Sequence, residues 1–150
     1  MLAEFQQACA DLVASPALVA QARVDPGPVL RRYDLTALEQ QRLVAFANNP
    51  GIEATCMLYR ANRVAPLALN LKALCSALGP QLRPLLDAYW TSYPNTDVHF
   101  LAECKRFCTY LEGLVAEGYA LPPDAMRRLA ADVAVLDMRL EASYTESPPT

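Results

Sequence analysis

Apolar residues recur every three to four positions along most of the chain, and this spacing predicts amphipathic helices. The clearest case starts after Leu121–Asp124, where apolar residues keep i, i+3, i+4 and i+7 spacing to Leu140. Strand signals are nearly absent, and only residues 31–35 could form a short extended segment. The pattern therefore predicts an all-α fold, an irregular bundle of about seven helices.

Proline and glycine divide this helical pattern into parts. The strongest break is Asp25–Pro28, which contains two prolines and a glycine. It predicts a junction between an N-terminal helical piece, residues 1–25, and a main body, residues 29–143, with a frayed tail at 144–150. The length is that of one ordinary domain, so we expect residues 1–150 to form a single helical domain.

Individual helix ends are marked by polar caps and prolines. Thr36–Glu39 has the sequence of a capping box, and Asp97 is a candidate N-cap for a long helix. One helix is expected from Ile52 to Asn62. The next is expected to carry Pro66 in its first turn and to continue to Leu78.

Composition excludes several classes of protein. Hydrophobic residues make up 53% of the 150 residues and charged residues 19%, so we expect an ordered chain with a sizeable core. The net charge of -3 argues against a nucleic-acid partner. The most apolar segment, Val64–Leu86, is broken by charges, a glycine and prolines, and Glu4 is unlike the basic start of a signal peptide. We therefore expect a cytoplasmic protein that does not contact a membrane.

No combination of residues in the sequence indicates catalysis or a metal centre. The one histidine, His99, has no second histidine to share a metal, and the glycines are too scattered for a phosphate loop. Cys104 and Cys108 lie one helical turn apart, but the ligands that would complete a zinc site are missing. The five cysteines lie in apolar periodic segments and are expected to be reduced and buried. We expect no catalytic residue and no metal ligand in this chain.

Aromatic and arginine residues are instead concentrated in the middle of the chain, as is typical of protein interfaces. Arg60 and Arg63 share a helix face, so they could clamp the carboxylates of a partner, or pair internally with Asp87 or Glu103. Neighbouring helical residues point about 100° apart, so one aromatic of the Tyr89–Trp90 pair is expected near the surface or in a groove. The candidate partner- or peptide-binding residues are Arg60, Arg63, Tyr89, Trp90, Tyr93, His99 and Arg106.

The same segment resembles a known family in the order of its motifs. Tyr59–Arg63 contains Arg-x-x-Arg, Leu85–Trp90 ends in Tyr-Trp before Tyr93–Pro94, and Ala102–Leu111 contains Arg-Phe. This order is similar to that of the small helical partner subunits of multinuclear iron enzymes that modify ribosomally made peptides, the TglI/MbnC-like family, and most of all to TglI. The resemblance covers roughly residues 30–115.

The resemblance implies a function for the chain. It implies a non-catalytic accessory subunit that forms a heterodimer with a larger iron-dependent oxygenase of the TIM-barrel type and holds no cofactor itself. The chain would help to present a precursor peptide whose cysteine is oxidised, in natural-product biosynthesis of the 3-thiaglutamate type. Two other interpretations stay open: a free-standing helical protein- or peptide-binding module or regulator, and a helical domain that binds a small molecule or haem.

Overall fold

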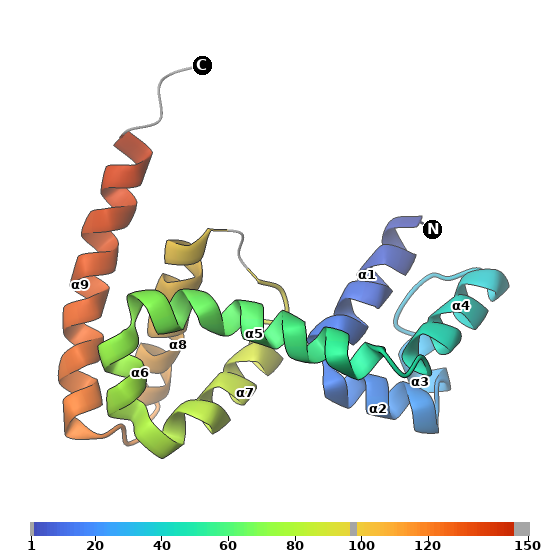
Figure 1. Cartoon of the computed structure of the whole chain (residues 1–150), viewed down its shortest axis with the longest axis horizontal. Coiled ribbons are helices and arrows are strands. Elements are labelled where there is room, and N and C mark those ends of the chain that lie inside the picture. Colours follow the sequence, from blue (N-terminus) through green and yellow to red (C-terminus); the bar gives the residue numbers. More distant parts are fainter. Residues whose placement is uncertain (1, 97–98, 146–150) are drawn as a thin grey trace. The chain divides into compact units, whose positions relative to one another are not determined.

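A computed structural model describes residues 2–96 and 99–145 of the chain (Figure 1). These residues form α-helices and one short 3₁₀ helix, and none of them lies in a β-strand. The predicted all-α fold is therefore confirmed. The proposed cap Asp97 and the tail residues 146–150 lie outside the described residues, whereas residues 144 and 145 continue the last helix.

The described helices fall into two compact units, residues 1–62 and residues 63–150. The Asp25–Pro28 break lies inside the first unit, where the helices on either side of it pack together. Residues 29–62 are therefore grouped with the N-terminal helices. The single domain over residues 1–150 stays a prediction.

Side chains cap the N-termini of two of the short helices in the first unit. The Ser15 hydroxyl accepts a hydrogen bond from the Leu18 amide, and Pro16 occupies the first helical position. Thr36 and Glu39 form the predicted capping box. The helices are α1 (Leu2–Ala14), α2 (Pro16–Val24), α3 (Gly27–Leu30), α4 (Ala37–Ala47) and the first part of α5 (Ile52–Asn70). Their shared core contains Ala8, Leu12, Val29, Leu43, Ile52 and Cys56.

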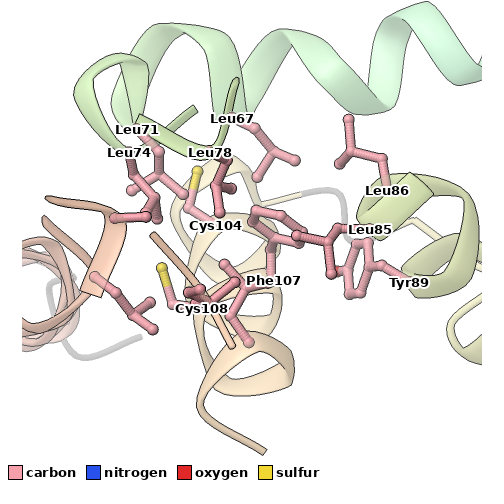
Figure 2. Packing of buried hydrophobic residues seen from close by; sticks show 14 of the residues in the cluster. Leu67, Leu71, Leu74, Leu78, Leu85, Leu86, Tyr89, Cys104, Phe107 and Cys108 are labelled. Atoms are coloured by element: carbon pink, nitrogen blue, oxygen red, sulfur yellow. The ribbon is translucent and has the colours of Figure 1, made fainter. Parts of the chain in front are cut away.

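The second unit packs its remaining helices around one leucine- and aromatic-rich core. Helix α9 lies against α6 and α8 (Figure 1). The elements are the end of α5, α6 (Lys72–Leu78), the 3₁₀ helix η1 (Gly79–Gln81), α7 (Leu82–Ser92), α8 (Phe100–Ala116) and α9 (Pro123–Thr145). In Figure 2, Phe107 and Cys108 of α8 point inward among the leucines of α6 and α7.

Two local expectations were wrong. The break predicted between Asn62 and Pro66 is absent, because α5 runs through Pro66 and ends only before Leu71, where the backbone leaves helical geometry. Pro66 is buried, and its carbonyl accepts hydrogen bonds from the Asn70 side chain and the Cys104 thiol, so its burial and these contacts accompany a proline inside the helix. Residues 31–35 form a turn and an irregular link without a partner strand among the described residues.

Candidate functional site

Predicted binding residues of the second unit converge on one buried carboxylate, Glu103 of α8. Arg63 donates hydrogen bonds to Oε1 of Glu103 from Nε at 3.2 Å and from Nη2 at 2.9 Å. The Tyr89 hydroxyl donates to the same oxygen at 3.2 Å, and Arg106 pairs with Oε2. Arg106 also donates from Nε to the Tyr89 hydroxyl at 3.0 Å. We call these four residues the Glu103 network.

The network is held in the interior of the second unit. Glu103 is 0% exposed and Arg63 1% exposed, so both charges depend on each other for the solvation that water would otherwise supply. Arg63 Nη1 donates to the carbonyls of Tyr93 at 2.7 Å and Pro94 at 3.2 Å. The network therefore fixes the backbone that leaves α7.

These contacts bear on the two interpretations of Arg63. Its guanidinium is buried, and its hydrogen bonds go to Glu103 and to two backbone carbonyls. Glu103 is one of the two internal partners that the sequence had suggested. Arg63 therefore positions other residues of this unit in the structure, and its guanidinium is not exposed to a ligand.

The expectation that one aromatic of the Tyr89–Trp90 pair lies near the surface was wrong. Tyr89 is 0% exposed and Trp90 is 8% exposed. The Arg63 guanidinium lies 5.4 Å from the ring centroid of Tyr89 and 5.9 Å from that of Trp90. Other parts of the unit cover helix α7 on more than one side, so both side chains are buried although they point about 100° apart.

The exposed part of this region is a hollow beside the end of α7. Tyr93 is 38% exposed, and its ring lies at 85° to the ring of Tyr110, with 6.2 Å between the centroids. The buried Tyr89 ring packs against both rings, with its centroid 5.3 Å from that of Tyr93 and 5.4 Å from that of Tyr110. The hollow has a volume of about 400 Å³, and we call it the aromatic groove; it is lined by Ser92, Tyr93, Thr109, Tyr110, Gly113, Leu114 and Glu117.

Of the predicted binding residues, His99 and Arg60 lie outside the network and the groove, whereas Arg106 of the network lies next to the groove. His99 is exposed at the N-cap position of α8 and does not line the groove. Arg106 places its guanidinium 5.6 Å from the Tyr93 ring centroid, next to the groove. Arg60 belongs to the first unit, where it lines a separate hollow of about 360 Å³ together with Arg23, Glu53, Cys56, Met57 and three residues of α2, Pro16, Val19 and Ala20.

Sequence reasoning named Glu103 only as a possible internal partner of the arginines, and it missed Tyr110 as a member of the site. Glu103 sits on the apolar stripe of α8, four residues before Phe107. A carboxylate on a buried face must find a cationic partner, so this position was a usable signal. Tyr110 carried no such signal, because only the packing of α7 against α8 brings its ring to Tyr93.

Cys56, Cys104 and Cys108 are buried as predicted, whereas Cys9 and Cys75 are partly exposed and differ from that prediction. Burial raises the pKa of the Cys104 thiol and of the Cys108 thiol to about 12. The Cys104 thiol donates to the Pro66 carbonyl at 3.3 Å. Among the described residues, no three His, Cys, Asp or Glu side chains are close enough together to hold a metal ion.

At about pH 8 we expect the folded protein to react with dithionitrobenzoate first at Cys9 and Cys75, which are partly exposed, and slowly at the buried Cys104 and Cys108. The thiolate is the reactive form, and burial suppresses it.

The same two buried thiols should make stability depend on pH. Unfolded thiols titrate near pH 8.5, so between that value and about 12 the unfolded state releases protons that the folded state keeps. Stability should therefore be unaffected below about pH 8 and fall as the pH rises toward 12. For the labelling experiment, urea-unfolded protein is the control, and equal labelling rates in the folded and unfolded protein would contradict that prediction.

Comparisons with known proteins give no relative, because no family model, curated protein or solved structure matches the chain. None of the described helices combines the length and the apolar character needed to cross a bilayer. The features that bear on function are therefore the Glu103 network, the aromatic groove and the motif resemblance.

Proposed function

We propose that this chain is a non-catalytic accessory subunit that binds a larger iron-dependent oxygenase and helps to present a precursor peptide to it. The peptide would be ribosomally made, and the oxygenase would oxidise its cysteine, as in biosynthesis of the 3-thiaglutamate type. The observation that carries the proposal is the aromatic groove, an accessible hollow at the point where the family-like motifs meet.

The groove has features that suit a peptide. Its volume of about 400 Å³ is in the range of small ligand sites and accommodates a few side chains. Tyr93 and Tyr110 are rigid aromatic residues that bury a large area at little cost in conformational entropy. The buried Arg63 holds the carbonyl of Tyr93, one of the lining residues, so this side of the groove loses little conformational freedom when a peptide binds.

The proposal assigns the iron and the oxidation to the partner subunit. A multinuclear iron site needs several histidine and carboxylate ligands, and this sequence contains one histidine. The buried carboxylate of Glu103 is already bonded to Arg63 and Arg106. This chain would dock on the oxygenase and orient the precursor peptide.

Co-expression with an iron-dependent oxygenase of this class, followed by size-exclusion chromatography, tests the proposal. We expect a 1:1 complex that survives chromatography. An interface of that stability buries on the order of 1,600 Å². Two separate peaks at micromolar concentration, in the presence of the precursor peptide as well, would contradict it. If the chain alone still bound the peptide, the result would favour the free-standing peptide-binding module.

A further inference from the structure

The aromatic groove has a charge of one sign. Glu117 is the one charged side chain among its lining residues, and the others are tyrosines, small residues, hydroxyl-bearing residues and a leucine. Glu117 and Tyr110 line the same hollow, and the pKa of Tyr110 is raised by burial and, to a smaller extent, by the negative charge of Glu117.

Two helix ends add to this negative charge. Ser92 and Tyr93 are the last residue and the C-cap of α7, and Gly113, Leu114 and Glu117 belong to the last turn and the cap of α8. The C-terminus of a helix carries a partial negative charge, which favours a cation within the last turn. Arg63 already donates to the Tyr93 carbonyl at the end of α7, so the negative potential of the groove comes mainly from the C-terminus of α8 and from Glu117.

The aromatic walls also favour a cation. The face of a tyrosine ring attracts ammonium and guanidinium groups, and sites for such groups are commonly lined by several aromatic rings set at angles to one another. Tyr93 and Tyr110 stand at 85° to each other. The ring of Tyr93 already takes part in one such contact, with Arg106 at 5.6 Å.

Arg106 opposes a second cation only at its own end of the groove. The Glu103 network contains two arginines and one carboxylate, so it carries net positive charge. Glu117 lies three turns further along α8, about 16 Å by helix rise. Salt screens exposed charges over about 8–10 Å, so repulsion from Arg106 is weak beside Glu117.

We infer that the aromatic groove binds a lysine or arginine side chain of a peptide, with the cationic group paired with Glu117 on the Tyr110 side of the groove and the apolar stem of that side chain against Tyr93. This rests on the proposed function, because it presupposes that a peptide occupies the groove. It adds that the peptide is recognised through a basic residue, which the proposed function does not require.

The test starts from a random 12-residue peptide library displayed on phage and selected against the full chain. We expect the enriched peptides to share a lysine or arginine at one position. One enriched peptide and its copy with glutamine at that position are then compared by fluorescence anisotropy. Glu117→Gln should weaken binding of the basic peptide by up to about fivefold and leave binding of the glutamine copy unchanged, since the loss of one exposed ion pair has an effect of roughly this size.

Two matched variants separate the local contact from general effects. Glu112→Gln removes the same charge from an exposed position of the same helix outside the groove, and it should leave binding unchanged. Tyr93→Phe keeps the aromatic ring and should bind nearly as the wild type does, whereas Tyr93→Leu should bind several-fold more weakly. Circular dichroism melts of each variant exclude unfolding as the cause.

The outcomes distinguish this inference from the proposed function. Enriched peptides without a basic residue that still lose binding in Tyr93→Leu would overturn the inference and leave peptide binding in place. Equal effects of Glu117→Gln on both peptides, or of Glu112→Gln and Glu117→Gln, would also overturn it. A failure to enrich any peptide would count against both.

Discussion

Replacing Glu103 with leucine should lower the free energy of unfolding by about 3–5 kcal/mol, because it leaves the buried Arg63 guanidinium without its carboxylate. Arg106 is partly exposed and can regain water, so most of the loss comes from Arg63. Urea unfolding followed by circular dichroism measures the effect. The matched control is Glu112→Leu, an exposed position on the same helix, which should change stability by less than about 0.5 kcal/mol.

The double variant Glu103→Leu with Arg63→Met sharpens this test. Apolar residues can replace a buried ion pair with little loss, whereas removal of one partner is costly. The double variant should therefore be more stable than Glu103→Leu alone. If the two single effects simply added, or if Glu103→Leu melted like the wild type, the buried pair would not have the role that we assign to it.

Replacing Phe107 with alanine should destabilise the protein by about 3–5 kcal/mol, the usual cost of deleting a buried phenylalanine ring. The side chain is 0% exposed and packs edge-to-face on Tyr89, with 5.2 Å between the ring centroids. Its loss removes apolar contacts and leaves a cavity at the centre of the second unit, as the packing in Figure 2 makes clear.

Phe100→Ala is the matched control for Phe107→Ala. It makes the same substitution in the same helix at a position that is 53% exposed, so it should cost less than about 1 kcal/mol. Thermal and urea unfolding of the two variants are compared with the wild type. Similar losses at both positions would show that the core is not centred on Phe107.

The sequence alone determined the helical class and many helix ends of this protein. These features are local: a 3.6-residue apolar period marks a helix, and a capping box such as Thr36–Glu39 satisfies backbone amides within one turn. Asp25–Pro28 was likewise identified as a break, and α2 does end at Val24. The candidate aromatic and arginine residues came from composition and spacing, and so did the motif resemblance.

Only the tertiary structure decided what those residues do. Arg63 and Glu103 are forty residues apart, and nothing within one turn of either residue reveals that they meet. Tyr89 and Trp90 are both buried because α7 is covered on more than one side. Pro66 stays inside α5 because its surroundings are packed. The aromatic groove exists because Tyr93 and Tyr110, from different helices, are brought together by folding. Contacts distant along the chain depend on the packing of all the helices of a unit at once, and no local pattern records that packing.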